Sequence, residues 1–454
     1  MKTLMDAAMA VICGHACGDA LGGATEGFDP APVEARYGGW ITGIVPPYQL
    51  DQPTARPLAP YHKGYGRCTD DTLMTRALVE VYAKRRDHLD AYAMADELVP
   101  IMMGAPRWVP ELDAAVPLLQ RVFLAEKYLA FRLSYGHVDP REAGVGNLVN
   151  CGAAMYMAPV GVVNPGEPAA AYAEAIDMAG AHQSSFGREA AGVFAACVAA
   201  AVAPGATVAS VVAAARAVAH DGTAAAIAAV LDAVAGVPVP ADEAAERAVL
   251  RAVRAAVAPY DTVGSEAYRQ PCLDARRPSR TKSIEELPVA LGLFVAHGGD
   301  YRATVLAAVN YGRDADSIAG MAGAIAAGLG GSTVVPAEWL DQIEAASKLD
   351  IRETGRLLGE AATAIVAADV ERTRARVARL GEYNAVIPAK ADAGRAEYEL
   401  ARTPEPKEGV DERSEEQAGT PGTRPVDPTP IPPRDPGLRR DDSEDPNDEE
   451  APCA

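Results

Sequence analysis

Two short acidic segments, each placed where a helix is expected to begin, constrain the fold more than any other feature of this chain. Their sequences are Thr69-Asp70-Asp71-Thr72 and Asp314-Ala315-Asp316-Ser317. A stretch rich in apolar residues follows each segment, so each pair of carboxylates is expected in the first turn of a packed helix. Ser, Thr and Asp also cap helices, and acids in the first turn favourably meet the helix dipole. Capping is therefore the alternative interpretation of either segment.

The number of acids favours a metal site over capping alone. Capping needs one side chain, whereas each segment offers two carboxylates and a hydroxyl. Carboxylates that converge repel one another unless a cation neutralises them. Ligand sets made only of oxygen suit Mg²⁺, Mn²⁺ or Ca²⁺ rather than zinc. If the fold brings the two segments together, they would form a site for hard divalent cations.

Other motifs accompany the acidic segments along the chain. They are Gly18-Asp19-Ala20-Leu21-Gly22 with the following Glu26, Gly152-Ala153-Ala154-Met155 with Ala158-Pro159-Val160-Gly161, and then His182. Together with the acidic segments, and in the expected order, they resemble the motifs of the ADP-ribosylglycohydrolase family, which includes dinitrogenase reductase-activating glycohydrolase and the ADP-ribosyl-acceptor hydrolases. The resemblance covers roughly residues 5–340 and is almost continuous from Glu286 to Gly331.

The resemblance implies both a fold and a reaction. The fold would be all-α, a compact orthogonal multi-helix bundle. The reaction would remove ADP-ribose from a modified protein side chain, with arginine favoured, by hydrolysis of a glycosidic bond at a binuclear metal site. Two divalent ions are expected, with Mg²⁺ favoured and Mn²⁺ possible. The implied metal ligands are Thr69, Asp70, Asp71, Asp314, Asp316 and Ser317, where Ser317 replaces the usual threonine and keeps its hydroxyl.

The chemistry of ribosyl hydrolysis explains why these residue types would be needed. Two divalent ions bridged by aspartates can bind the vicinal ribose hydroxyls and hold the anomeric carbon at a fixed distance from a water. Cleavage passes through an oxocarbenium-like state, so a nearby carboxylate must act as general acid or base and stabilise the positive charge that develops on the ribose. The resemblance assigns this role to Glu26, for which a solvated loop acid is the alternative. Asp19 is expected to accept hydrogen bonds from backbone amides rather than to bind metal.

The residues expected to contact substrate depart from the family's pattern. Cys151 stands where asparagine usually precedes Gly-Ala-Ala-Met, Tyr156 where arginine usually follows it, and Arg313 where a second glycine is common. An added guanidinium could contact a phosphate or block a pocket built around glycine. His182 could contact substrate or lie satisfied in the core. The implied substrate-binding residues are Gly152, Ala153, Ala154, Met155, Tyr156, His182 and Arg313.

These departures leave the leaving group undetermined, and two alternative functions stay open. The site could hydrolyse a free ADP-ribose conjugate or a nucleoside-like metabolite, or the protein could bind ADP-ribose without turnover. The expected partner is an ADP-ribosylated protein or a small ADP-ribosyl or nucleoside-like substrate, with no obligate protein partner. The net charge of −20 argues against nonspecific binding of nucleic acid, which needs concentrated Lys and Arg.

Composition supports a helical chain with a distinct C-terminal tail. Alanine dominates, aromatic residues make up 6%, and alternation of β-branched residues is scarce, so most of the chain can be helix. A catalytic domain is expected over residues 1–384, with an extra helix near 351–380 that is a structural cap or an interface. Residues 385–454 are expected to be an acidic, Pro-rich, disordered tail, because residues 401–454 hold 15 acidic against 7 basic residues, 11 prolines and no aromatic residue.

The remaining features bear on the cellular compartment. Seven cysteines without a Cys-x-x-Cys spacing argue against a disulfide framework or a structural zinc site. Asp6 interrupts the apolar start of the chain, which leads directly into Gly18-Asp19, so no cleaved signal peptide is expected. Apolar runs of roughly 20 residues without polar breaks are lacking, so no membrane span is expected. We expect a cytoplasmic protein.

Overall fold

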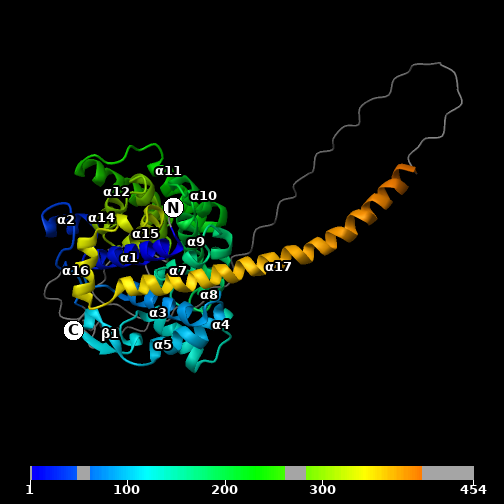
Figure 1. Cartoon of the computed structure of the whole chain (residues 1–454). Coiled ribbons are helices and arrows are strands. Elements are labelled where there is room, and N and C mark those ends of the chain that lie inside the picture. Colours follow the sequence, from blue (N-terminus) through cyan, green and yellow to red (C-terminus); the bar gives the residue numbers. More distant parts are fainter. Residues whose placement is uncertain (1–2, 49–61, 261–282, 401–454) are drawn as a thin grey trace, which may run out of the picture. The chain divides into compact units, whose positions relative to one another are not determined.

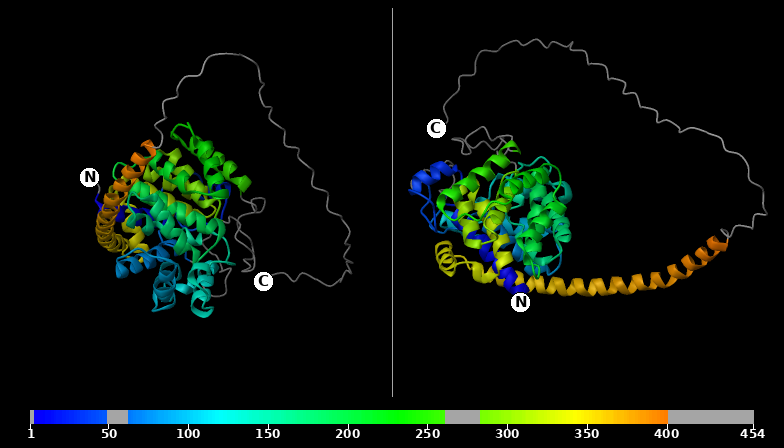
Figure 2. Two further views of the ribbon diagram at one scale, coloured as in Figure 1. Left: turned by 90° about the vertical axis from the view of Figure 1, so that its right-hand side faces the viewer. Right: turned by 90° about the horizontal axis from the view of Figure 1, so that it is seen from above.

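The computed structural model describes residues 3–48, 62–260 and 283–400, and helices dominate these residues (Figure 1). The prediction of an all-α fold is confirmed. The only strands in the described ranges are β1 (Arg107–Val109) and β2 (Ala114–Val116), which pair antiparallel. The chain divides into two compact units, residues 1–373 and 374–454. Two further views show helices on all sides of the first unit (Figure 2).

The α-helices follow the chain as α1 Leu4–Gly22, α2 Pro30–Tyr37, α3 Asp70–Arg85, α4 Ala91–Ala93, α5 Val99–Met103, α6 Leu124–Ala130, α7 Ala158–Val163, α8 Pro168–Gly180, α9 Ser185–Val202, α10 Val208–Val218, α11 Asp221–Val234, α12 Glu243–Val257, α13 Glu286–Ala296, α14 Tyr301–Tyr311, α15 Ala315–Gly330, α16 Ala337–Ser347 and α17 Ile351–Leu400. Short π-helices cover Met94–Leu98 and Phe131–Tyr135, and 3₁₀ turns cover Pro110–Leu112, Leu118–Gln120, Pro140–Glu142, Cys151–Ala153, Ala258–Tyr260 and Ser332–Val334.

Helices α1 and α15 pack against each other along a line of small residues. Gly14, Gly18 and Gly22 recur every four residues and therefore share one face of α1. A Cβ atom on Gly18 would overlap the backbone carbonyl of Ala319, and a Cβ atom on Gly22 would overlap that of Ala315. The two backbones can approach this closely only because these positions of α1 are glycine.

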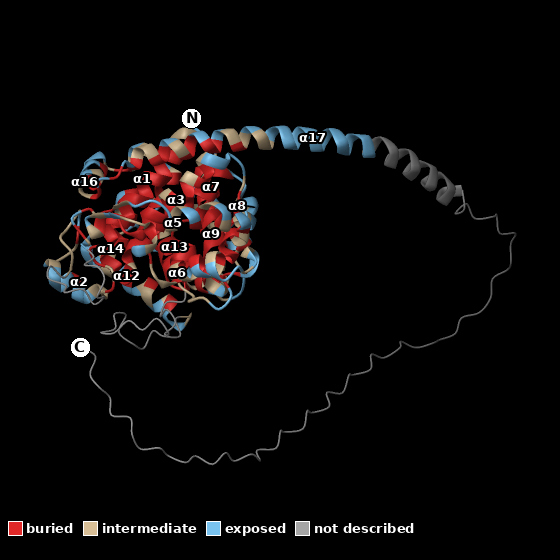
Figure 3. Cartoon of the chain, turned by 90° about the horizontal axis from the view of Figure 1, so that it is seen from below, coloured by how far each residue is buried: buried red, intermediate tan, exposed pale blue. Residues whose placement is uncertain are grey.

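The core of the first unit is one continuous hydrophobic cluster to which α1, α3, α7, α9, α13 and α15 contribute. Burial is concentrated on these central helices, whereas α2 and α16 carry exposed residues at the edge (Figure 3). Helices α1 and α9 have the length and mean hydropathy of membrane-spanning segments, and 78% of the apolar window of each is buried inside the protein. Their place in the core therefore accounts for their hydropathy.

The extra helix predicted near residues 351–380 is longer in the structure than predicted. It begins at Ile351 and continues as α17 to Leu400, so the tail predicted from residue 385 begins inside a helix. Residues 351–400 are rich in Ala, Glu, Arg and Leu, which are strong helix formers, and this propensity explains the longer helix. The rest of the predicted tail, residues 401–454, lies outside the described residues.

The close approach of α1 and α15 predicts a large effect of a single methyl group. Gly18→Ala places a Cβ against the backbone of Ala319, and backbone cannot move aside as a flexible side chain can. We expect a loss of about 2 kcal/mol or more in the free energy of unfolding, measured by denaturant titration. Gly381→Ala is the matched control, because a Cβ there meets nothing within 4 Å. Equal stability of the two variants would contradict the packing described above.

His88, just beyond α3, joins two other helices through its ring. Its Nδ1 lies 2.6 Å from the Glu174 carboxylate of α8, and its Nε2 lies 3.0 Å from the Asp369 carboxylate of α17. Hydrogen bonding to Glu174, followed by the charge of that group and the contact with Asp369, raises the pKa of His88 from 6.5 to about 9, against the opposing effect of partial burial. The imidazolium therefore links α3 to both helices at neutral pH.

This linkage predicts how stability depends on pH. Because folding raises the pKa of His88, its contribution is fully present below pH 6.5 and is lost as the pH rises through about 9. His88→Gln should cost about 1 kcal/mol at pH 6, after allowance for solvent screening of a partly exposed group, and almost nothing at about pH 10. His62→Gln, at an exposed histidine, is the control for thermal melts across this range. A cost that does not change with pH would rule out the charged linkage.

Candidate metal centre

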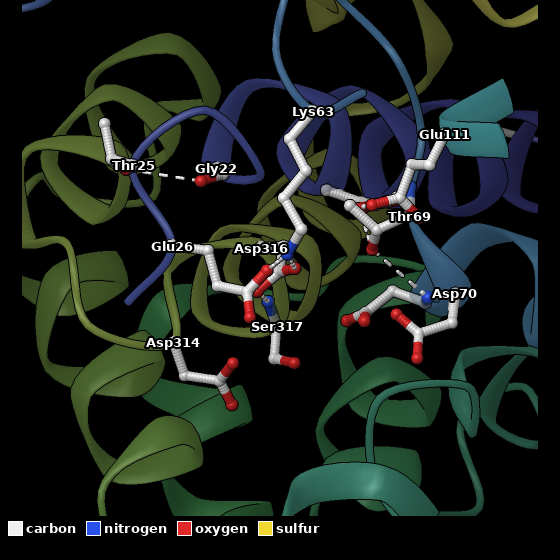
Figure 4. Close-up of polar contacts among 12 residues, drawn as sticks. Gly22, Thr25, Glu26, Lys63, Thr69, Asp70, Glu111, Asp314, Asp316 and Ser317 are labelled. Atoms are coloured by element: carbon white, nitrogen blue, oxygen red, sulfur yellow. Dashed lines mark hydrogen bonds and ion pairs between the residues drawn. The ribbon is translucent and has the colours of Figure 1, made fainter. Parts of the chain in front are cut away.

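The fold brings the two acidic segments together, as Figure 4 shows for the starts of α3 and α15. Carboxylates from these helices and from the N-terminal motif form two clusters, whose oxygen atoms lie within 4.8 Å of one another in each cluster. The inner cluster comprises Asp19, Asp71 and Asp316, and the outer cluster comprises Glu26, Asp314 and Asp316. Asp316 therefore belongs to both clusters, and the two clusters adjoin at this residue.

Asp19 fixes the position of the α3 N-terminus. It lies inside α1 and is fully buried, and its carboxylate accepts hydrogen bonds from the backbone amides of Thr69 at 3.1 Å and Thr72 at 3.2 Å and from the Thr69 hydroxyl at 2.7 Å. Burial, and then the charge of Asp316, raises the pKa of Asp19 to about 7. The backbone amides expected as its partners are thus those of α3 rather than of its own motif.

Glu26 is placed by a backbone connection to the start of α15. The amide of Gly27 donates to the carbonyl of Arg313, and the amide of Arg313 donates to the carbonyl of Phe28, both at 2.6 Å. The Thr25 hydroxyl donates to the carbonyl of Val309 at 2.9 Å and anchors the same loop. These bonds hold the Glu26 side chain beside Asp314, within the outer cluster.

Asp70 and Asp71, at the start of α3, differ in whether a positively charged side chain pairs with them. Asp70 pairs with Arg121 at 2.9 Å, and Arg121 also binds the buried carboxylate of Glu111. Burial raises the pKa of Asp70, and the charge of Arg121 opposes that shift. Asp71 is 2% exposed, and its Oδ1 atom has no hydrogen-bond partner among the described residues. Burial, followed by the charges of Asp316 and Asp19, raises the pKa of Asp71 well above its usual value.

The residues present fit hard divalent cations. Both clusters offer only oxygen ligands, and Asp71 of the inner cluster has an unpaired buried oxygen. Burial and the neighbouring charge of Asp316 likewise raise the pKa of Asp314 well above its usual value. A bound cation would remove the repulsion that these shifts express. The hydroxyl of Thr69 is bonded to Asp19, and that of Ser317 lies 3.3 Å from the Cys151 sulfur.

The predicted substrate loop lies against the start of α15. Cys151 donates its thiol hydrogen to Asp314 Oδ2 at 2.8 Å, so the residue that replaces the family's asparagine contacts a predicted metal ligand. Asn150 caps the 3₁₀ turn Cys151–Ala153 by accepting from the amide of Gly152 at 3.1 Å. The residues of the motif itself are buried. They are Gly152, Ala153, Ala154 and Met155.

Tyr156 and His182 form a buried polar chain with Glu126 of α6. The Tyr156 hydroxyl lies 2.9 Å from Nδ1 of His182, and Nε2 of His182 lies 3.4 Å from a Glu126 oxygen. All three side chains are fully buried. Burial, with the charge of Glu126, raises the pKa of Tyr156 well above its usual value. A Cβ on Gly152 would overlap Glu126, so this chain lies directly behind the substrate loop.

Arg313 occupies a backbone conformation that favours glycine, with φ of +58°. Its guanidinium binds Glu285 at 2.7 Å and Asp29 at 3.1 Å, and only 3% of its side chain is exposed. The ion pairs offset the strain of a left-handed arginine, which is on the order of 1 kcal/mol. The contact with a substrate phosphate remains a prediction.

Sequence reasoning missed several charged residues around the clusters. Lys63, in the loop before α3, contacts Glu26 and Asp316, and nothing in its Gly- and Pro-rich surroundings signals this position. Glu286 lies with Cys151 and Asp314 within 4.8 Å, and the two adjacent acids Glu285 and Glu286 at the start of the apolar helix α13 were a usable signal. Arg121 and Glu126 carry no local pattern that points to the site.

Asp71 offers a test of the centre that does not depend on activity. Asp71→Asn removes one of the repelling buried charges, so the metal-free protein should gain about 1 kcal/mol in stability. The same change should abolish most of the stabilisation of about 2.7 kcal/mol that a metal gives at a hundredfold excess over its dissociation constant. Thermal melts with and without Mn²⁺ measure both effects. The exposed Asp232→Asn variant should change neither, and a metal response retained by Asp71→Asn would contradict the assignment.

Comparisons with known proteins identify the family of this chain. The family model described as ADP-ribosylglycohydrolase matches residues 1–375. A search of curated proteins found no match. Among solved structures, an ADP-ribosylglycohydrolase-related protein complex is similar over 80% of this chain and 100% of that chain, with 17% identity and a TM-score of 0.46. The match to the family model spans most of the chain and includes both acidic segments and the N-terminal motif, so this chain belongs to the ADP-ribosylglycohydrolase family.

Proposed function

We propose that this protein is a metal-dependent glycoside hydrolase that removes ADP-ribose from a modified protein side chain, with arginine favoured. The observation that carries the proposal is the pair of carboxylate clusters that share Asp316, with Glu26 on the outer side. Inner residue Asp71 and outer residue Asp314 would complete a centre for two divalent ions, Mg²⁺ or Mn²⁺. The family supplies the general activity, and the substrate and the number of ions are our proposal.

The residues of the site would have different roles around a bound ribose. Two divalent cations, when bound, would hold the vicinal ribose hydroxyls and withdraw charge from them. Asp71 and Asp316 would fix that position through oxygens that are already buried. A carboxylate oxygen of Glu26 would accept the proton of the attacking water, and its charge would stabilise the oxocarbenium-like state. Asp19 would act indirectly, by holding the start of α3 in place.

The surroundings of the centre support a cationic leaving group. Glu126 and Glu286 are buried near the clusters and add negative charge to the carboxylates already there. Negative charge around the site stabilises a guanidinium leaving group. It stabilises a neutral serine hydroxyl less. The same charge favours a free conjugate only if its leaving group is cationic.

The test is release of free ADP-ribose, quantified by mass spectrometry, from arginine-linked, serine-linked and free conjugates with Mg²⁺, Mn²⁺ or chelator present. We expect chelator-sensitive release from the arginine linkage. At saturating metal, Glu26→Gln should lower kcat by roughly 10²-fold or more, because the amide cannot accept the proton, while ADP-ribose affinity changes little. Asp70→Ala should reduce both metal binding and activity, because it removes the carboxylate that pairs with Arg121 at the start of α3 and changes the charge beside the clusters.

Each other outcome points to a different function. Release only from a free conjugate would identify a metabolite hydrolase. ADP-ribose binding with no release from any linkage would identify a binder without turnover. Full activity of the Asp70→Ala variant would show that the assigned centre is not the active site.

A further inference from the structure

Lys63 places a cationic group of the protein in the outer cluster. Its Nζ atom forms an ion pair with the Glu26 carboxylate and lies 4.0 Å from Oδ2 of Asp316 (Figure 4). Of the Lys63 side chain 23% is exposed, whereas 5% of the Asp316 side chain is exposed. The ammonium therefore reaches from a partly open position to a buried carboxylate.

The backbone on both sides of Lys63 is tied down. The amide of His62 donates to the carbonyl of Glu111 at 2.7 Å, and the amide of Tyr65 donates to the carbonyl of Val45 at 2.9 Å. Gly64, with φ of +77°, packs so closely that an added Cβ would lie 2.5 Å from the backbone nitrogen of Pro47. These contacts fix the backbone of Lys63 in a position from which its side chain reaches the clusters.

The ammonium and an outer divalent ion need the same oxygen atoms. Glu26 and Asp316 are two of the three carboxylates of the outer cluster, and both contact Lys63. The inner cluster is less engaged, because among its carboxylates Asp316 alone pairs with Lys63 in the described ranges, at 4.0 Å, and Asp71 keeps an unpaired buried oxygen. A cation should therefore enter the inner cluster while Lys63 keeps its ion pair with Glu26.

We infer that Lys63 sets the metal occupancy of this centre by competing with a divalent ion for the outer cluster. The inference rests on the proposed function only in that the carboxylate clusters bind metal. The inner ion binds first, and the outer ion binds more weakly because it must displace the ammonium from Glu26 and Asp316. Since part of the Lys63 side chain is exposed, the displaced ammonium can turn to solvent. The two positions of this chain are therefore unequal.

The experiment is a titration of the full chain with Mn²⁺. Isothermal calorimetry measures the binding, and electron paramagnetic resonance measures the bound ions. For the unmodified protein we expect two dissociation constants separated by roughly tenfold or more. Lys63→Met should tighten the weaker site by roughly tenfold and change the tighter one by less than about threefold, because only the outer cluster loses its competitor. A spin-coupled signal should then appear at lower Mn²⁺ concentrations.

Two control variants separate local competition from a change in total charge. Lys348→Met removes one positive charge at a lysine that pairs with Asp113 outside the clusters, and it should leave both constants unchanged. Lys63→Arg keeps the charge and should keep the two sites unequal. Lys63 lies in a loop and is partly exposed, so its variants should remain folded, which circular dichroism checks.

The outcomes distinguish this inference from the proposed function. Two sites of equal affinity in the unmodified protein, or a Lys63→Met titration identical to it, would overturn the competition while leaving the metal centre intact. Equal tightening of both sites in Lys63→Met would also overturn it, because the effect would then be general electrostatics. Absence of Mn²⁺ binding in every variant would instead overturn the metal centre itself.

Discussion

The contact between α1 and α15 is the constraint on which the rest of the structure depends. Glycines on α1 let its backbone lie against the backbone of α15, and this places Asp19 of one helix beside Asp316 of the other. Asp19 then accepts from the amides that begin α3, so the third helix is positioned by a side chain rather than by packing alone. The Gly-Asp-Ala-x-Gly motif thus combines a packing function and an anchoring function in five residues.

The centre places several carboxylates in a buried region, which is unfavourable unless they are compensated. The fold provides compensation in different ways. Arg121 forms ion pairs with both Asp70 and Glu111, hydrogen bonds from the start of α3 satisfy Asp19, and Lys63 contacts Glu26 and Asp316 from a partly open position. Asp71 receives no such partner within the described residues. The uncompensated charge is therefore concentrated at the position where a cation is expected, and this is the usual relation between a strained electrostatic environment and function.

Much of the fold class and the location of the centre could be predicted from sequence, because both depend on local patterns. The helix starts at Asp70 and Ala315 follow from capping residues and apolar periodicity, and the meeting of the two starts follows from the family resemblance. The surrounding charges could not be predicted, since Arg121, Glu126 and Lys63 reach the site through tertiary contacts between segments without any shared pattern. The long helix α17 was underestimated because its propensity continues past the part that resembles the family. The assignment of substrate contacts such as Arg313 and His182 stays a prediction.

The pairing of α1 with α15 also bears on how the protein acquires its structure during synthesis. Tyr301 of α14 donates to the carbonyl of Gly14 across 287 residues of sequence, and the contacts with α15 are more distant still. Helix α1 is synthesised long before α15, so the glycine face of α1 stays without its α15 partner until almost all of the first unit has been translated. Nascent chains that stop before Asp314 would lack the α15 partner of α1 and two of the five cluster carboxylates, Asp314 and Asp316, so they cannot complete either cluster. Assembly of the centre thus reports completion of the fold.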